Sequence, residues 1–241
     1  MNEQKYCGEE LELFAKVLNW KRYWSQAIRE YVLGDVLEVG AGTGSNTEFM
    51  SSGSAGRWVC LEPDPSLLDQ LRVKLGPAAS RNYETICGTL RSIDGDWRFD
   101  TIIYIDVLEH IEDDRAELKL AAAHLRPGGR AIVLSPAHPW LFTPFDAAIG
   151  HFRRYNRSML RSISPPELRI ERLMYLDSAG MLASAANRLL LRQSMPTERQ
   201  LQLWDRRIIP VSRVFDALLR RSMGKSIIGV WRKPEEGAAG R

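Results

Sequence analysis

Three glycines at alternate positions, Gly40, Gly42 and Gly44, follow the apolar segment 36–39 and precede a helical pattern. This order predicts a strand, a tight turn and a helix. Glycine permits a positive φ in the turn and leaves no Cβ between the backbone and a ligand over the end of the strand. The segment therefore predicts a nucleotide-binding loop, around which the rest of the fold is organised.

The next β-prone segment, residues 57–62, ends in Glu62. In a doubly wound sheet, an acid about twenty residues after such a loop accepts hydrogen bonds from ribose hydroxyls. Asn46 and Thr47 follow the glycines, so the further glycine of the dinucleotide pattern G-x-G-x-x-G is missing. The spacing disfavours pyrophosphate binding, and with it a nicotinamide-dependent oxidoreductase.

At these residues the chain resembles the class I S-adenosylmethionine-dependent methyltransferases, whose first motif is acid-x-G-x-G-x-G. Glu38 stands at the acid position, and Glu62 fits the ribose-binding acid of that family. Residues 99–111 are similar to its fourth strand, and residues 125–130 to the turn before its fifth. The resemblance covers roughly residues 20–136 and implies S-adenosyl-L-methionine as the cofactor.

The resemblance and the expected strand ends together suggest the cofactor contacts. Glu38 fixes the loop or, through water, the methionine ammonium, and Asp106 at the carboxyl end of the fourth strand faces the sulfonium. Many relatives place an acid after the third strand to bind the adenine amino group, but this chain has Gly88-Thr89-Leu90 there. The remaining expected cofactor residues are Gly40, Ala41, Gly42, Gly44, Glu62, Pro63, Thr89, Leu90 and Val107.

Strand and helix patterns alternate along the first half of the chain, which predicts an α/β fold with a doubly wound, mostly parallel, seven-stranded Rossmann-like sheet. The family implies that the last strand, near residues 226–231, runs antiparallel. With 241 residues and 44% hydrophobic content, a single domain is the simplest account. Besides N-terminal helices, we expect a cofactor-binding half (20–136), a lid (137–166), a helical insert (179–223) and a disordered tail (234–241).

The net charge of +3 hides an asymmetry between the two halves. Residues 1–136 carry 15 Lys and Arg against 21 Asp and Glu, whereas residues 137–241 carry 18 against 9. The basic half favours an anionic substrate or surface, although a solvated basic face would give the same pattern.

Leucines and arginines alternate at helical spacing in the insert, which suggests a cap over an amphiphilic or lipid-linked acceptor and peripheral membrane contact. The cysteines lack metal-ligand spacing, and no apolar leader is seen, so we expect a cytoplasmic protein, membrane-associated through the insert.

Methyl transfer from a sulfonium needs the donor and the nucleophile in line, and a base when the acceptor is a hydroxyl. His110 and His151 are the candidate bases, with backbone ordering as the alternative role of His110. Arg153, Arg154 and Tyr155 follow His151 and are predicted substrate contacts, because adjacent guanidiniums bind carboxylate or phosphate groups. Salt bridges within the lid are the alternative for this cluster.

Two further classes are disfavoured. The enzymes that methylate nucleic-acid bases carry Asp/Asn-Pro-Pro-aromatic after the fourth strand, where this chain has residues 106–109, Asp-Val-Leu-Glu. The carboxylate and Asp-Asn set of metal-assisted catechol-type methylation is not found, so we expect a metal-independent enzyme and assign no metal ligand. The sequence thus predicts a methyltransferase for a small or lipid-linked, anionic acceptor, with no nucleic-acid partner; oxygen, nitrogen and carbon acceptors and all oligomeric states stay open. A membrane-surface or partner-binding module that keeps the cofactor without methyl transfer is the rival hypothesis.

Overall fold

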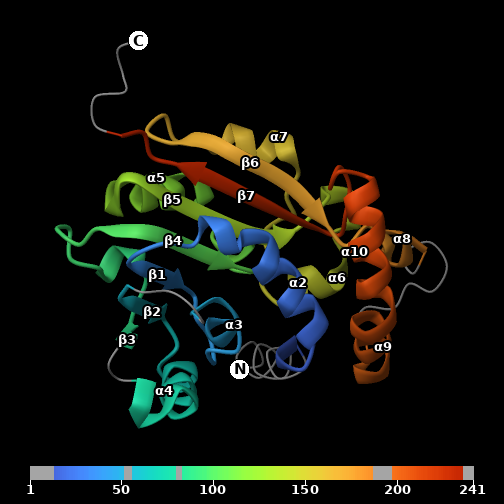
Figure 1. Ribbon diagram of the computed structural model, residues 1–241, viewed down its shortest axis with the longest axis horizontal. Helices are drawn as coiled ribbons and strands as arrows, with labels where there is room; N and C mark the ends of the chain where they lie inside the picture. Colours follow the sequence, from blue (N-terminus) through green and yellow to red (C-terminus); the bar gives the residue numbers. More distant parts are fainter. Residues whose placement is uncertain (1–13, 52–55, 80–82, 187–196, 236–241) are drawn as a thin grey trace.

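The computed structural model describes residues 14–51, 56–79, 83–186 and 197–235. These residues form one seven-stranded sheet with helices around it (Figure 1). The strand order is β3-β2-β1-β4-β5-β7-β6. Strands β1 to β5 are parallel, and β7 is antiparallel to both of its neighbours. The expected doubly wound sheet with an antiparallel last strand is therefore confirmed. The strands are β1 (Val36–Val39), β2 (Trp58–Glu62), β3 (Tyr83–Cys87), β4 (Phe99–Ile105), β5 (Leu125–Pro136), β6 (Arg169–Leu176) and β7 (Ser226–Arg232).

Two hydrophobic cores cover the two faces of the sheet, because successive strand residues point to opposite sides. In β4, Ile102 and Tyr104 join one core, and Ile103 and Ile105 join the other. The first core also takes residues from α5 (Asp114–His124) and α7 (Arg157–Ser162). The second takes residues from α2 (Leu18–Ile28), α4 (Pro65–Ala79) and the C-terminal helices. Burial on both faces explains why the central strands read as nearly continuous apolar runs.

Element boundaries differ from the sequence expectation at two strands. β4 ends at Ile105, because Asp106 takes a positive φ of 55°. β5 begins at Leu125 rather than at the expected residue 131, since Leu125 already pairs with Phe99 before a shift in register. Both boundaries depend on the neighbouring strand and on backbone strain, which the local sequence does not encode. The remaining short elements of this half are η1 (Arg29–Tyr31), α3 (Thr47–Ser51), η2 (Leu90–Ser92) and η3 (Leu108–His110).

The lid is more helical than its prolines and aromatic residues suggested. It contains η4 (Pro139–Leu141), α6 (Pro144–Ala148) and α7, and an isolated bridge joins Ala137 to Tyr155. Side-chain caps supply the helix starts: Thr143 and Asp146 form a capping box on α6. Short helices of this kind begin at a cap and lack the length that apolar periodicity needs to show them.

The insert forms α8 (Ser178–Ala186), α9 (Glu198–Leu203), a π-helical turn η6 (Trp204–Ile208) and α10 (Ile209–Leu218), as the Leu/Arg pattern predicted. Asp205 accepts hydrogen bonds from the backbone of α2, including Trp20 N at 2.9 Å. Asp216 on α10 accepts one from the Tyr23 hydroxyl at 2.8 Å. None of the helices in the described part of the chain is long and apolar enough to cross a membrane. Most of the expected tail lies outside the described residues.

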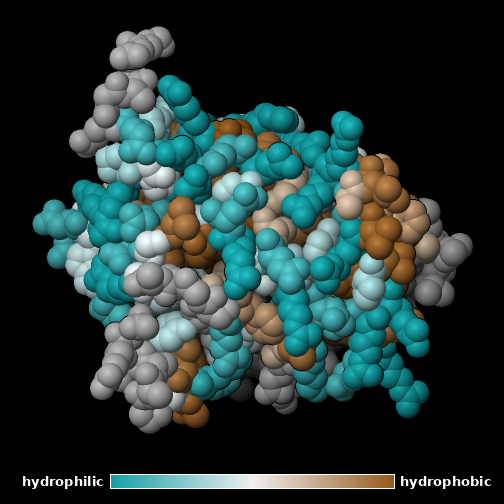
Figure 2. Space-filling view, viewed as in Figure 1, coloured by the Kyte–Doolittle hydropathy of each residue, from teal (hydrophilic) through white to brown (hydrophobic). Residues whose placement is uncertain are grey.

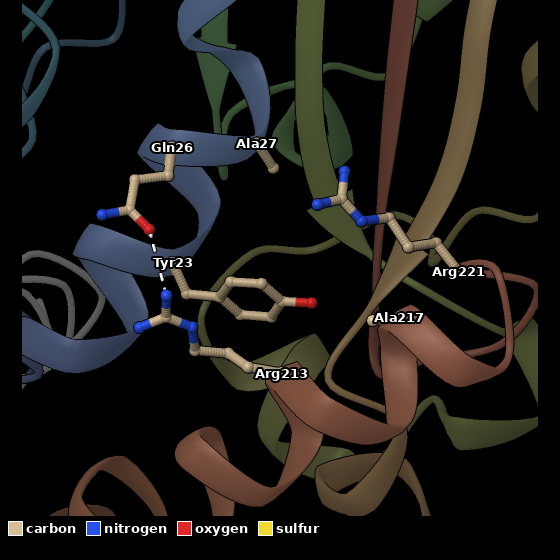
Figure 3. Close-up of a pocket in the computed structure, with 6 residues that line it drawn as sticks. All are labelled: Tyr23, Gln26, Ala27, Arg213, Ala217 and Arg221. Carbon is tan, nitrogen blue, oxygen red and sulfur yellow. Dashed lines mark hydrogen bonds between the residues drawn. The ribbon is translucent and has the colours of Figure 1, made fainter.

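The side chain of Tyr23, on α2, points toward α10 and lines a cavity of about 190 Å³ (Figure 3). Arg213 bridges the two helices by donating to Gln26 at 3.3 Å, and its guanidinium lies 5.6 Å from the centroid of the Tyr23 ring. Burial and the hydrogen bond to Asp216 raise the pKa of Tyr23 above its usual range. The insert is thus tied to the first half of the chain by buried polar contacts.

Candidate active site

A cavity of about 1040 Å³ opens at the carboxyl ends of β1, β2 and β4. Strands β1 and β4 are neighbours in the sheet. From β1 the strand order continues through β2 to β3 on one side, and from β4 it continues to β5 on the other side. The cavity therefore lies at the topological switch point of the sheet. Pockets for drug-sized ligands span roughly 300–1,000 Å³. This cavity, which we call the chamber, therefore has room for a cofactor and an acceptor together.

The glycine loop forms one wall of the chamber. Gly40, Gly42 and Gly44 take φ values of 67°, 54° and 74°, a region that disfavours side chains. A Cβ at Gly40 would lie 2.6 Å from a methyl group of Val107, so the close approach of loop and β4 requires glycine there. Gly40, Ala41 and Gly42 line the chamber, whereas Gly44 packs beside α4.

Glu38 lies beneath this loop and is 2% exposed. Its carboxylate accepts hydrogen bonds from the Thr47 hydroxyl at 2.8 Å and from the Trp58 indole N–H at 2.9 Å. Burial raises the pKa of Glu38 to about 7. Its side chain ties β1, β2 and the start of α3 together, which corresponds to the loop-fixing role among the two considered from the sequence.

Glu62 presents its carboxylate to the chamber from the end of β2. The carboxylate accepts hydrogen bonds from Gly42 N at 2.8 Å and from Asp64 N at 2.9 Å, which holds it against the glycine loop. Burial raises the pKa of Glu62. The residues expected at the adenine end, Pro63, Thr89 and Leu90, line the chamber beside it, together with Val107.

A polar cluster occupies the far side of the chamber, where β4 and β5 end. Asp106 opens onto the chamber, and the surrounding protein raises its pKa to about 6. Glu109 is 0% exposed; its Oε2 accepts from the Ser135 hydroxyl at 2.8 Å, while its Oε1 has no hydrogen-bond partner. Burial raises the pKa of Glu109 well above its usual range. Two carboxyl groups that resist ionisation thus lie at this point.

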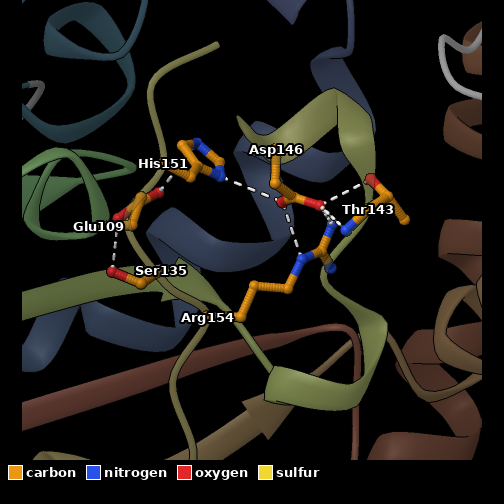
Figure 4. A network of polar contacts seen from close by, with 6 residues as sticks. All are labelled: Glu109, Ser135, Thr143, Asp146, His151 and Arg154. Carbon is orange, nitrogen blue, oxygen red and sulfur yellow. Dashed lines mark hydrogen bonds and ion pairs between the residues drawn. The ribbon is translucent and has the colours of Figure 1, made fainter. Parts of the chain in front are cut away.

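The lid closes over this cluster through Asp146 (Figure 4). Asp146 binds Arg154 at 2.8 and 2.9 Å, accepts from Thr143, and lies 3.1 Å from Nδ1 of His151. These contacts hold the pKa of Asp146 below its usual range despite the burial that opposes them. Because the Asp146 carboxylate accepts hydrogen bonds, Nδ1 of His151 is the donor in this contact, and the other ring nitrogen, Nε2, faces Glu109.

The two candidate bases lie together, although they come from segments about forty residues apart. The His110 and His151 rings meet edge to face, with centroids 4.5 Å apart, and both line the chamber. The surrounding protein lowers the pKa of His110 to about 4, although the side chain is exposed to the open chamber. His110 is therefore neutral at pH 7, and its low pKa makes it a weak base.

The predicted substrate contacts are placed differently from one another. Arg153 binds Asp114 and the backbone carbonyl of Glu112, and Tyr155 donates to Asp114 from a fully buried position. Of the three, Arg154 alone lines the chamber, and its charge is matched by Asp146. The cluster therefore serves the salt bridges of the lid, and substrate contact by Arg153, Arg154 and Tyr155 stays a prediction.

Two cations of the chamber were not expected. Lys21 on α2 donates to the Ser45 carbonyl at 3.0 Å, and burial lowers its pKa to about 8. Lys225, just before β7, lies 4.9 Å from the centroid of the Trp204 ring and, among the described residues, has no carboxylate at ion-pair distance. Both residues reach the chamber through contacts between distant segments, so no local motif marks them.

Comparison with known proteins relates part of this chain to methyltransferases. Residues 36–129 match a family model described as "Methyltransferase domain". The demethylmenaquinone methyltransferase of Tropheryma whipplei is 28% identical over 152 residues, which cover 61% of this chain and 58% of the relative. The ubiquinone biosynthesis O-methyltransferase of Bradyrhizobium diazoefficiens is 32% identical over 108 residues, 44% of this chain and 41% of the relative. This chain thus matches less than two thirds of the length of these curated relatives.

Solved structures share the fold at low sequence identity. The N-methyltransferase NodS from Bradyrhizobium japonicum, in complex with S-adenosyl-L-homocysteine, aligns with a TM-score of 0.57 at 13% identity, covering 91% of this chain and 89% of that one. The [4+2]-cyclase SpnF aligns with a TM-score of 0.61 at 16% identity, covering 89% and 82%. At these identities the likeness concerns the fold alone.

Proposed function

We propose that this chain, which belongs to the class I S-adenosylmethionine-dependent methyltransferases, transfers a methyl group to a small or lipid-linked, anionic acceptor held in the chamber. One observation carries the proposal. The glycine loop and Glu62 share a single chamber with Asp106 and the two histidines, and the chamber is large enough for two ligands.

The residues present fit the cofactor that the family implies. When bound, S-adenosylmethionine supplies an electrophilic methyl group on a sulfonium. Gly40 and Gly42 line the chamber without side chains, and Glu62 is oriented to accept hydrogen bonds from ribose hydroxyls. Asp106 contributes negative charge on the side of the sulfonium. These residues bind and orient, which for this chemistry provides much of the rate acceleration.

A hydroxyl acceptor would also lose a proton, and the paired histidines supply the base. His110 is neutral near pH 7, and Asp146 orients the ring of His151. For an anionic acceptor, Lys225 provides an ammonium group in the chamber that no described carboxylate neutralises at ion-pair distance. We assign the acceptor's negative group to the neighbourhood of Lys225.

An amphiphilic acceptor is supported by the insert and by the named relatives. Leu201 and Trp204 line the chamber, and the outer face of α10 exposes Val214, Phe215 and Leu218 by 61%, 51% and 73%. Figure 2 shows hydrophobic surface in this region of the molecule. Two curated relatives are named for demethylmenaquinone and for ubiquinone biosynthesis. A lipid-linked acceptor would use both the chamber and the apolar face beside it.

Two measurements test the proposal. In calorimetry, the wild-type chain should bind S-adenosylmethionine, Glu62→Ala and Gly42→Arg should not, and the exposed control Glu167→Gln should match the wild type. A tritiated-methyl transfer screen over lipid and water-soluble lysate pools should then label the lipid pool, more weakly with Lys225→Met than with the exposed control Lys119→Met. Unchanged affinity in both Glu62→Ala and Gly42→Arg would refute the assigned site.

The exposed apolar face of α10 also favours a second function, a membrane-surface or partner-binding module that keeps the cofactor without methyl transfer. Tight binding of S-adenosylmethionine, no methyl transfer to either pool, and loss of liposome binding in Phe215→Ser with Leu218→Ser would decide for the module.

A further inference from the structure

We infer that Glu109, His110 and His151 form a binding site for a divalent transition-metal ion, with Zn²⁺ as the best match, in the wall of the chamber. Each residue offers one ligand atom, and the three atoms lie within 4.8 Å of one another. All three residues line the chamber. The inference does not rest on methyl transfer, but an ion bound there would occupy the two histidines that are the candidate bases, and it departs from our expectation of a metal-independent enzyme.

The first support is an unpaired oxygen. Glu109 is 0% exposed, and its Oε1 has no hydrogen-bond partner, although unpaired buried polar atoms are costly. This oxygen lies 3.9 Å from Nε2 of His151, too far for a hydrogen bond. A cation between the two atoms would bind both, and among the described residues no hydrogen-bond donor pairs with this oxygen.

The second support is the set of outer partners, one for each proposed ligand. The Ser135 hydroxyl donates to the other oxygen of Glu109 at 2.8 Å, and Asp146 accepts from Nδ1 of His151 at 3.1 Å. The backbone of Gly150 is hydrogen-bonded to the His110 ring. Metal-binding histidines characteristically donate their second N–H to a carboxylate or a carbonyl, which orients the ligand nitrogen.

The Asp146 carboxylate is itself held by Arg154 and Thr143 (Figure 4). The lid thus supplies both a ligand, His151, and the support that fixes its ring. A loop histidine without such support would retain rotational freedom and would bind an ion less tightly.

The ligand set indicates the kind of ion. Two imidazoles and one carboxylate suit Zn²⁺ and other first-row transition metals, whereas Mg²⁺ and Ca²⁺ prefer oxygen ligands. With Zn–ligand bonds of about 2.0–2.1 Å, neighbouring ligand atoms in a tetrahedron lie about 3.4 Å apart. Glu109 Oε1 and His151 Nε2 would therefore approach by about half an ångström. Three protein ligands leave the fourth position open to the chamber, where an acceptor oxygen or water can bind.

Titration of the chelator-treated, untagged chain with Zn²⁺ and with Co²⁺ tests the site. We expect one ion per chain, a visible absorption spectrum for Co²⁺ typical of a low-coordinate site, and no comparable affinity for Mg²⁺. Glu109→Gln and His151→Gln should each weaken Zn²⁺ binding at least tenfold and abolish the Co²⁺ spectrum. His138→Gln, which alters a histidine outside the cluster, and Cys87→Ser should leave both unchanged.

Thermal unfolding separates loss of the site from loss of the fold. Zn²⁺ should raise the unfolding temperature of the wild type and of His138→Gln, but not that of a folded His151→Gln chain, because an ion stabilises only the state that binds it. Absence of stoichiometric binding by the wild type, or binding that survives the Glu109→Gln and His151→Gln double substitution, would overturn the inference and leave the cluster as a proton relay. Neither result would alter the S-adenosylmethionine titrations of Glu62→Ala.

Discussion

The substitution Glu38→Gln should make the stability of the protein less sensitive to alkaline pH. Burial raises the pKa of Glu38 from 4.5 to about 7, so the folded chain holds this proton more tightly than the unfolded chain does. The contribution of Glu38 to the free energy of unfolding is therefore most favourable below pH 4.5 and is lost as the pH rises toward and through about 7. A tenfold change in proton affinity corresponds to about 1.4 kcal/mol, so the whole effect is about 3 kcal/mol. Most of this effect falls between pH 5 and pH 8.

Urea unfolding of the wild type and of Glu38→Gln at pH 5 and pH 8 measures this effect. Other titrating groups contribute to both chains, so the difference between the two free energies of unfolding isolates Glu38. That difference should move by roughly 2–3 kcal/mol in favour of the variant from pH 5 to pH 8. The exposed control Glu167→Gln should show no such movement. A difference that moves by much less than about 1 kcal/mol would refute the view that burial raises the pKa of Glu38.

Three further substitutions address the lid, the loop and the insert. Asp146→Asn leaves Arg154 without its buried carboxylate and should lower the free energy of unfolding by about 3–5 kcal/mol, with part of the loss recovered in the double variant with Arg154→Gln. Gly40→Ala must place a Cβ against Val107 at a positive φ and should weaken S-adenosylmethionine binding at least tenfold in calorimetry, while circular dichroism shows a folded chain. Tyr23→Phe removes the buried hydrogen bond to the carboxylate of α10 and should cost about 1–3 kcal/mol in urea unfolding, with the cofactor affinity unchanged.

The strands and helices of the cofactor-binding half (20–136) can be predicted from the sequence because the residue patterns that mark them are local. The strand Tyr83–Cys87 is a β-prone run that ends just before Gly88, and Asp113 caps α5 by accepting a hydrogen bond from Ala116 N. The early start of β5 at Leu125 was not predictable in the same way, since it depends on pairing with Phe99 across the sheet. Local chemistry predicts where elements begin when a cap or a turn is involved, and strand pairing decides the remaining boundaries.

The same division runs through the candidate site. Glu62 and Asp106 follow from their positions at strand ends, and both line the chamber. Glu109 is adjacent in sequence to His110. Its Oε1 is buried without a hydrogen-bond partner only in the folded chain, where β5 and the lid pack around it. Lys225 has no motif at all, because its role in the chamber depends on Trp204 packing beside it from a separate helix. The functional interpretation of Glu109 and Lys225 therefore depends on contacts in the folded chain, and no local sequence pattern identifies these two residues.

The chamber therefore has two walls of different origin. The donor wall is built from residues of the first half of the chain, with contacts such as Gly42 N to Glu62, while the acceptor wall joins residues of both halves, including His151 with Glu109. On the proposed function, substitutions in the acceptor wall should change which molecule is methylated while the cofactor wall stays intact. A class I fold of this kind can thus retain one cofactor and acquire new acceptors through its lid and insert, which is why the acceptor must be sought with the Lys225, Glu109 and His151 side of the chamber in view.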